Sequence, residues 1–346
     1  MDAGAGTSRD AAWGHTRRPR LDDVAARVGL SPASVSLVLR NAPGPSAATR
    51  RRVLEAAAEL GYRADKTASL LARRRTHLLG VMVDVRNSFH AELVEYLHEA
   101  ADQVGYDLVL STVTRTRDEQ RAVETLLDFR CEALILLGPE AATTHLFALD
   151  RHQPVVVVGR RIAAAGLDVV RSADHEGVGL AVDHLVELGH RDIAYVDGGK
   201  GTIASDRRRG YRTAMRRHRL GDRVMVVPAD HTEESGTRAA QSLLSDNDPP
   251  SAVMTFNDRS ALGFLDALTR TGVQVPGDMS VVGYDDNPSA QLAHVNLTTV
   301  RQDAPQQAER AVAAAVERLD HGRKIPCEVV LAPHLVVRGT TAPPAR

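Results

Sequence analysis

The sequence predicts a small all-α domain followed by an α/β core of two doubly wound lobes, each built on a parallel sheet. Apolar residues recur with helical spacing between residues 21 and 60. From residue 78, apolar runs of strand length alternate with amphipathic stretches of about 10 to 16 residues, and this alternation restarts after residue 172. Strands separated by such helices form βαβ units, so two series predict two lobes.

Two short helices are predicted at the start of the all-α domain. The residues on the apolar face of the first are Leu21, Val24, Ala25 and Val28. Gly29 and Leu30 follow, and then Ser31 suits the N-cap of a second helix. Pro32 suits its first position because proline lacks the N–H that would be unpaired there. The second helix is predicted to end near Arg40.

A third helix is predicted to begin near Ser46 and to end at Gly61, a residue that favours helix ends. Its inward-facing residues are predicted to be Val53, Leu54, Ala57 and Leu60. Two short helices joined at a glycine turn and braced by a third form a helix-turn-helix. Opposite the buried side, the second helix presents Ala33, Ser36, Leu37 and Arg40.

Charge is concentrated around this predicted motif. Between Arg17 and Arg75 there are 13 Lys or Arg and 5 Asp or Glu, a net charge of +8, whereas the whole chain carries −1. A basic module on an acidic body is typical of phosphate binding. Charge alone leaves open an ordinary solvated face, but the helix pattern together with the charge favours DNA binding.

The N-terminal domain closely resembles the DNA-binding domain of the lac/gal repressor family. The matching segments are Leu21 to Ala25, Gly29 to Ser31, Ser34 to Leu39, Thr49-Arg50 and Glu59 to Tyr62. The resemblance runs through nearly the whole chain and implies a core like that of periplasmic binding proteins. It also implies a homodimeric transcriptional regulator, a repressor of a pseudo-palindromic operator, whose DNA affinity responds to a small effector.

The resemblance assigns residues to DNA. Those predicted to contact it are Pro32, Ala33, Ser34, Ser36, Leu37, Arg40, Asn41, Arg50, Ala68 and Leu71. Leu71 takes the position of a hinge leucine that enters the minor groove. The alternative is an ordinary linker whose leucine packs on the core. The family pattern has Pro-Asn where this chain has Ala64-Asp65.

The resemblance also divides the chain, with three crossings between the lobes. The predicted parts are a disordered tail (1–19), the helix-turn-helix (20–63), a hinge (64–75), an N-lobe (76–172 plus about 304–331) and a C-lobe (173–300 plus about 332–340). The helix from about Gln306 to Leu319 would return to the N-lobe. The strand around Leu335 to Arg338 would return to the C-lobe.

Polar residues that directly follow strands are the candidates for ligand binding, because parallel sheets bind ligands at the carboxyl ends of their strands. The residues alone point to the segments 87–90, 159–160, 257–258 and 285–286. With the resemblance, the predicted effector-binding residues are Phe89, His90, Arg160, Arg207, His231, Asn257, Asp285 and Gln302. Arg, Asp and Asn suit the hydroxyls of a sugar or the edge of a purine. The alternative for Arg207 and Asp285 is a structural ion pair.

Other kinds of function receive little support. The 14 histidines lack metal-ligand spacing, Cys131 and Cys327 form no framework, and the segment 198–202 lacks the full spacing of a phosphate loop. We therefore expect no metal, no cofactor and no enzymatic activity. The polar N-terminus is unlike a secretory signal, and no apolar run suits a bilayer, so we expect a cytoplasmic protein. The rival interpretations are a solute-binding protein, a sugar-modifying enzyme and a nonspecific nucleoid protein.

Overall fold

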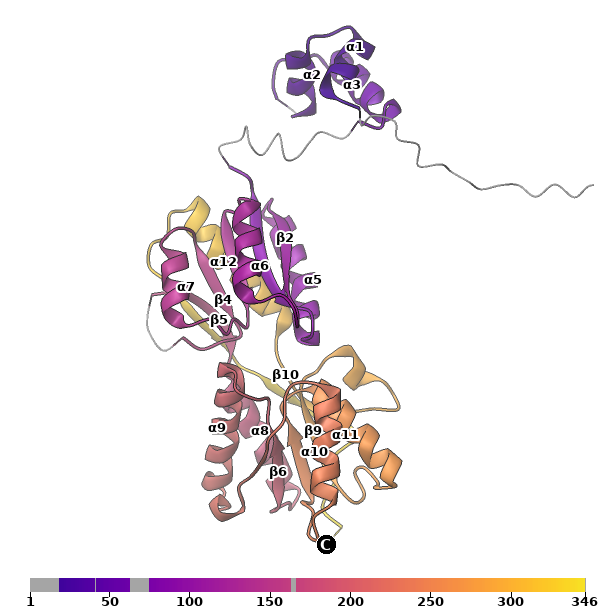
Figure 1. The fold of residues 1–346 in the computed structure, drawn as a ribbon, viewed down its shortest axis with the longest axis vertical. Helices are drawn as coiled ribbons and strands as arrows, with labels where there is room; N and C mark the ends of the chain where they lie inside the picture. The colour runs from indigo at the N-terminus through magenta and orange to yellow at the C-terminus, as the bar shows by residue number, and fades with distance from the viewer. Residues whose placement is uncertain (1–18, 41, 63–74, 163–165, 346) are drawn as a thin grey trace, which may run out of the picture. The chain divides into compact units, whose positions relative to one another are not determined.

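The computed structural model describes residues 19–40, 42–62, 75–162 and 166–345, and the chain divides into two compact units, Met1–Arg75 and Thr76–Arg346. Within the described residues, the first unit contains three helices, and the second contains two six-stranded sheets covered by helices (Figure 1). Among the described residues, no helix is both long enough and apolar enough to span a bilayer. The predicted hinge residues Ala68 and Leu71 and the recognition residue Asn41 lie outside the described ranges.

The N-terminal unit is a helix-turn-helix with a brace. Its helices are α1 (Leu21–Val28), α2 (Pro32–Leu39) and α3 (Ala47–Glu59). Valine side chains form most of the core, and Gly29 ends α1 in the left-handed conformation, at φ 65°. The prediction that Leu54 faces inward is wrong: its side chain is 50% exposed, and Ala56 occupies the buried stripe instead. Helical spacing allows either residue beside Val53, and the packing of α3 against α1 and α2 selects Ala56.

The N-lobe is a parallel sheet in the order β11-β5-β4-β3-β1-β2. Its strands are β1 (Leu78–Asp84), β2 (Asp107–Val113), β3 (Ala133–Leu137), β4 (Val155–Val158), β5 (Asp168–Ser172) and β11 (Glu328–Leu331). Helices α5 (Ser88–Gln103) and α12 (Ala304–Asp320) pack together on one face. Helices α6 (Glu119–Asp128) and α7 (Thr143–Asp150) cover the other, so the sheet is doubly wound (Figure 1).

The C-lobe repeats this plan in the order β12-β10-β9-β8-β6-β7, with β12 alone antiparallel among the strands described. Its strands are β6 (Ile193–Val196), β7 (Met225–Val227), β8 (Ala252–Thr255), β9 (Ser280–Asp285), β10 (Thr298–Arg301) and β12 (His334–Val336). Helices α8 (Asp174–Glu187) and α9 (Thr202–Arg217) cover one face. Helices α10 (Glu233–Leu244) and α11 (Asp258–Thr271) cover the other.

The chain passes between the lobes three times, through very short segments. Ala173 separates β5 from α8, two residues separate β10 from α12, and Ala332-Pro333 separate β11 from β12. The last passage places β11 in the first sheet and β12 in the second. The carboxyl ends of β1, β3, β6 and β8 consequently face the space between the lobes, where residues from both line one cavity.

Candidate functional site

One face of α2 is exposed to solvent. Ser31 is the N-cap, and its Oγ accepts a hydrogen bond from the Ser34 N–H at 3.2 Å. Val35 and Val38 are buried against the other helices, whereas Pro32, Ala33 and Arg40 are exposed. Leu37 is 38% exposed on the same side of the helix. The face thus combines small residues, one large apolar side chain and one cation, as expected from the sequence.

Arg50, which is predicted to contact DNA, also makes hydrogen bonds within the N-terminal unit. Its guanidinium, on α3, donates to the Ala42 carbonyl at 3.0 Å and to the Val38 carbonyl at 3.5 Å. These carbonyls lie at and beyond the C-terminal end of α2, where helix carbonyls lack partners within the helix. Arg50 therefore fixes the end of α2 against α3, whatever further contact it makes with DNA.

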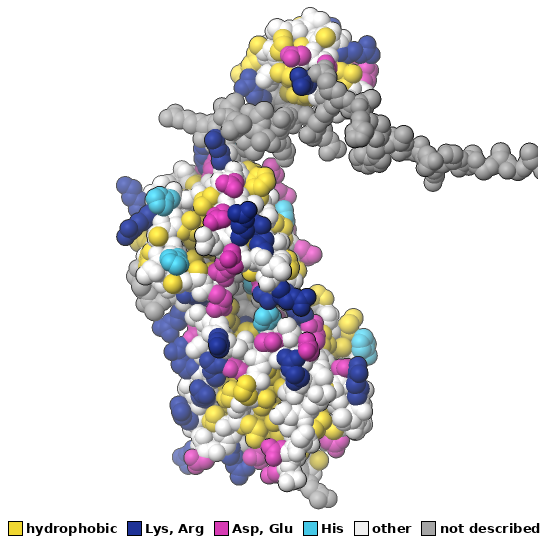
Figure 2. All heavy atoms as spheres, in the orientation of Figure 1, with side chains coloured by type: hydrophobic (Ala, Val, Ile, Leu, Met, Phe, Trp, Pro, Cys, Tyr) yellow, Lys and Arg dark blue, Asp and Glu magenta, His cyan; other side chains and the backbone are white. Residues whose placement is uncertain are grey.

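A cavity of about 460 Å³ lies between the two lobes of the core. Its walls come from the ends of β1, β3, β6 and β8 and from the loops that follow them. Figure 2 shows the hollow between the lobes, with acidic, basic and histidine side chains at its rim. The residues that line it and carry polar side chains include Asp84, Arg86, Asn87, His90, Glu119, Glu140, Lys200, Asp230 and His231.

His90 presents a hydrogen-bond donor to this cavity. Its Nδ1 accepts a hydrogen bond from the Asp84 backbone N–H at 3.2 Å, so the proton of the neutral ring resides on Nε2. Burial lowers the pKa of His90 to about 4, and the ring is therefore neutral at pH 7. No described residue bonds to Nε2, which leaves this N–H for an acceptor oxygen of a ligand.

His231 approaches from the opposite lobe. Burial lowers its pKa, and its Nε2 is buried without a partner among the described residues. Asn257 positions the backbone here, because its Nδ2 donates to the His231 carbonyl at 3.2 Å while its Oδ1 caps α11. The two imidazoles therefore line one cavity from two lobes, and neither Nε2 has a hydrogen-bond partner within the part of the chain that the structure describes.

The carboxylates around the cavity are already bonded within the protein. Asp84 holds Arg86 through two hydrogen bonds of 3.0 and 2.7 Å. Asp230 accepts from the Thr232 N–H at 2.8 Å, and Glu140 accepts from the backbone of Thr202, at the N-terminus of α9. The cavity is therefore polar, but its charges are largely matched before any ligand enters.

Arg207, Asp285 and Gln302 form a separate buried cluster. The Arg207 Nε donates to Asp174 at 2.7 Å, and its Nη2 lies 3.6 Å from the Asp285 carboxylate. The Gln302 Nε2 donates to Asp285 at 2.8 Å. Burial raises the pKa of Asp285 to about 6, although Arg207 and Gln302 oppose this. Arg207 is only 4% exposed and does not line the cavity formed by the described residues.

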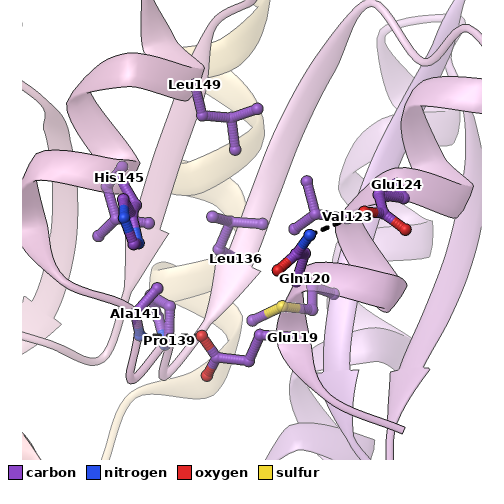
Figure 3. Close-up of a pocket in the computed structure, with 11 residues that line it drawn as sticks. Glu119, Gln120, Val123, Glu124, Leu136, Pro139, Ala141, His145 and Leu149 are labelled. Atoms are coloured by element: carbon purple, nitrogen blue, oxygen red, sulfur yellow. Dashed lines mark hydrogen bonds between the residues drawn. The ribbon is translucent and has the colours of Figure 1, made fainter.

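A second cavity, of about 380 Å³, lies within the N-lobe between α6 and α7. Figure 3 shows Leu136 on the sheet beneath it, with Val123 and Leu149 among its walls. The Glu119 carboxylate at its edge is occupied, since it accepts from the backbone N–H groups of Glu140 and Ala141. A largely apolar hollow without convergent free polar groups is the weaker candidate for a specific ligand site.

Comparison with known proteins decides the family. The model of the bacterial regulatory proteins, lacI family, matches residues 20–65, and that of the periplasmic binding protein-like domain matches residues 182–341. The HTH-type transcriptional regulator DegA of Bacillus subtilis is 31% identical over 93% of this chain and 97% of its own length. The chain belongs to the LacI family. It is therefore a member of a family of bacterial regulators that bind DNA through a helix-turn-helix.

Solved structures of LacI-family proteins share the fold. A LacI transcriptional regulator from a Rhodococcus species is 47% identical over 77% of this chain and 98% of its own, with a TM-score of 0.74. The lac repressor dimer bound to operator and the anti-inducer ONPF is 29% identical over 94% of this chain and 100% of its own, with a TM-score of 0.82. The expected fold class and family are thereby confirmed.

The LacI-family core brings some of the predicted effector residues together and not others. His90 and His231 line the cavity, and Arg207, Asp285 and Gln302 cluster behind it. Two residues lie elsewhere. Phe89 packs in the core of the N-lobe, and the Arg160 guanidinium donates to the carbonyls of Pro139 and Ala141, at 2.7 and 2.6 Å. Arg160 was predicted because it directly follows a strand. The direction of its side chain is set instead by the carbonyls of the loop after β3.

Several lining residues were not predicted from the sequence. Asp84 and Arg86 immediately precede the segment 87–90 that the strand-end rule selected, so a wider window would have included them. Lys200 and Glu140 lie in loops that contain glycine or proline and carry no recognisable motif. Phe256 is the aromatic residue of the lining, and it lies beside Asn257, which was predicted.

Proposed function

We propose that the protein is a sequence-specific repressor whose affinity for its operator is controlled by a small effector, a sugar or sugar derivative, bound between the lobes. The observation that carries the proposal is the combination, in one chain of the LacI family, of an exposed recognition face on α2 and a polar cavity between two lobes. Control arises when an effector favours one arrangement of the lobes over another.

The DNA-binding part rests on α2. A helix of this kind enters the major groove, where Leu37 offers apolar contact to a thymine methyl and Arg40 can bond to a base or a phosphate. Two copies of the chain would read a pseudo-palindromic operator as a homodimer, as the related lac repressor dimer is bound to its operator. We place such a repressor in the cytoplasm, on the nucleoid when bound to its operator.

The effector part rests on the cavity. A volume of about 460 Å³ accommodates a small metabolite, and the His90 Nε2–H offers it a neutral donor. Because the neighbouring carboxylates are already bonded, an uncharged polyhydroxy ligand suits the site better than a cation. A purine is the alternative, since a flat ring with acceptor nitrogens can also meet this donor and the Phe256 ring.

Fluorescence anisotropy with duplexes from the region upstream of the gene tests the proposal. We expect binding to one duplex that contains an inverted repeat to exceed binding to a scrambled duplex by about 1,000-fold or more, the lower end of the range typical of specific binding. Addition of the correct sugar should change that affinity about 5- to 150-fold. Equal binding to all duplexes at physiological salt would indicate a nonspecific DNA-binding protein instead.

A further inference from the structure

Aliphatic side chains line the cavity between α6 and α7. Figure 3 shows Val123 of α6 on one side, Leu149 of α7 on the other and Leu136 on the strand β3 beneath them. The other apolar residues of the lining are Met82, Pro139, Ala141 and Leu146. Gln120 and His145 also line the cavity, and both are exposed, so they mark its mouth. The cavity is thus an apolar hollow that opens to solvent beside polar groups.

This cavity is large enough for a ligand. Its volume is about 380 Å³, whereas protein interiors contain few voids larger than a water molecule. An apolar cavity of about 150 Å³ already binds benzene. The floor is closed, because Met82, Leu136 and Leu146 are at most 2% exposed. A small ring-shaped molecule that enters would therefore exchange water for contact with aliphatic side chains on several sides.

The charged groups at the cavity indicate which ligands it favours. Both oxygens of Glu119 accept backbone N–H groups of the loop after β3, at 2.6 and 2.9 Å. Glu124 accepts from the Gln120 Nε2 at 3.0 Å and pairs with Arg121 at 3.5 Å. The two carboxylates repel an anion. A cation would lose its water in an apolar cavity whose carboxylates already have partners. An uncharged ligand therefore suits the cavity best.

The cavity between α6 and α7 shares a wall with the cavity between the lobes. Met82 and Glu119 line both of them. The loop 138–141 separates them, because residues 139 and 141 line the first cavity and residues 138 and 140 line the second. Glu140 also accepts a hydrogen bond from the backbone of Thr202, in the C-lobe. A molecule held between α6 and α7 would therefore contact a loop that reaches the other lobe.

We propose that the cavity between α6 and α7 is an accessory binding site for a small uncharged molecule with an apolar ring, linked to the cavity between the lobes through the loop 138–141. The ring is buried against the aliphatic walls, and a hydroxyl group on it faces the solvent beside Gln120 and His145. A bound molecule favours the position of the loop in which Glu119 and Glu140 make the bonds described above. This inference goes beyond the proposed function, because neither DNA nor the effector takes part in it.

Saturation-transfer NMR titrations of the full-length protein with benzyl alcohol and with benzoate test the ligand class. We expect benzyl alcohol to bind with a dissociation constant of about 1 mM or lower, which is within reach of a ligand of this size. Benzoate has the same ring but a carboxylate, so it should bind at least about tenfold more weakly. Failure of benzyl alcohol to bind well above 1 mM, or equal binding of the two compounds, would overturn the proposal.

Variants that fill the cavity locate the bound compound. We expect Val123→Phe and Leu149→Phe, which place a ring inside the cavity from either helix, to weaken the binding of benzyl alcohol by about tenfold or more. Leu127→Phe is the matched control, because Leu127 lies on α6, is 38% exposed and does not line the cavity. It should leave binding unchanged. Thermal unfolding shows which variants are folded. Binding that is unchanged in a folded filling variant would mean that the compound binds elsewhere.

Amide hydrogen exchange of the wild type tests the link between the two cavities. At saturating benzyl alcohol, we expect exchange to slow by about threefold or more at Glu140 and Ala141, whose N–H groups Glu119 holds, and at Thr202. Helix α10 lines neither cavity and should exchange at an unchanged rate. Protection confined to α6 and α7 would refute the link. This measurement needs no variant, so it decides the link even if the filling variants do not fold.

Discussion

His90 makes the stability of the core depend on pH. Its folded-state pKa of about 4 lies below the ordinary value near 6.5, because the ring is buried. As the pH falls from about 6.5 towards 4, the unfolded chain binds a proton that the folded chain does not, so stability is lost. By pH 4.5 this amounts to about 2 kcal/mol for this group.

We therefore expect His90→Gln, which retains an acceptor for the Asp84 N–H, to lose about 2 kcal/mol less stability between pH 7 and pH 4.5 than the wild type does. Urea unfolding of the core at both pH values measures this. His98→Gln, at an exposed position of the same helix, is the matched control. Identical pH dependence in the wild type and His90→Gln would show that His90 titrates normally in the folded protein.

Leu37 is predicted to read the DNA sequence through apolar contact. Leu37→Arg replaces that contact with a guanidinium that can donate two hydrogen bonds to guanine. We therefore expect the preferred base to change at one position of the half-site. Selection from random duplexes measures the preference. Leu54→Arg adds the same charge at an exposed apolar residue of α3 and should change the overall affinity more than the preference. An unaltered preference in Leu37→Arg would argue against a base-reading role.

At the scale of elements, two glycines allow α10 and α11 to pack closely. A Cβ at Gly263 would lie 1.8 Å from the Glu233 carbonyl oxygen, and one at Gly236 would lie 2.0 Å from that of Ser260. Both neighbours are helix backbone, which cannot move away like the end of a flexible side chain. We expect Gly263→Ala to destabilise the protein by about 1 to 3 kcal/mol, the usual range for overpacking.

Gly179 in α8 is the matched control, because replacing it with alanine is expected to change the stability in the opposite direction. A Cβ there meets only the Arg217 guanidinium, at an ordinary 3.7 Å. Alanine favours the helix over glycine by roughly 0.5 to 1 kcal/mol, so Gly179→Ala should stabilise the protein. Urea unfolding of both variants measures the difference. A destabilisation of equal size in both would mean that the close approach of α10 and α11 carries no special cost.

Helices and strands could be predicted where the sequence carries a local signal, such as a helix cap or an apolar run of strand length. The caps at Ser31 and Ser46 and the ends at Gly29 and Gly61 specify three helices by short-range chemistry, and apolar runs such as 133–137 and 155–158 specify buried strands. Strand β5 and helix α7 were not predicted, because their short segments have weak periodicity. The start of α9 at Thr202 also lacks a local signal, since Gly201 caps the helix without a side-chain hydrogen bond.

The candidate site was harder to predict than the fold, for a physical reason. Proximity to a strand end follows from sequence, but the direction of a side chain depends on partners far along the chain. Asp174 holds Arg207 from another helix, and loop carbonyls hold Arg160. The Phe256 ring lies where it does because Gly198 makes room for it. No pattern in the segments themselves indicates these pairings.

At the scale of the whole core, Glu92 makes the interface between the lobes sensitive to pH. It lies on α5 of the N-lobe, and its Oε2 is buried without a partner among the described residues. Burial and then the charges of Asp285 and Asp286 in the C-lobe raise its pKa to about 7, although Arg301 opposes this. The protonated form is favoured in the folded core, so stability decreases as the pH rises from about 4.5 through 7.

We expect Glu92→Gln to stabilise the core at pH 8 by about 1 kcal/mol, a figure reduced for partial exposure, and to have little effect at pH 4. Thermal unfolding at both pH values measures this. Glu99→Gln, at an exposed position of α5, should change neither value. A gain for Glu92→Gln that is the same at pH 4 as at pH 8 would mean that ionisation of the Glu92 carboxyl is not its cause.

The three short passages between the lobes restrict how the core can rearrange. Leu331 and His334 are three Cα steps apart and can be separated by at most about 11 Å. The other two passages are as short or shorter. Three such short connections limit how far the lobes can separate, so we expect the lobes to move mainly by rotation about these connections. On this basis, a bound effector would act on the core by changing the angle between its lobes.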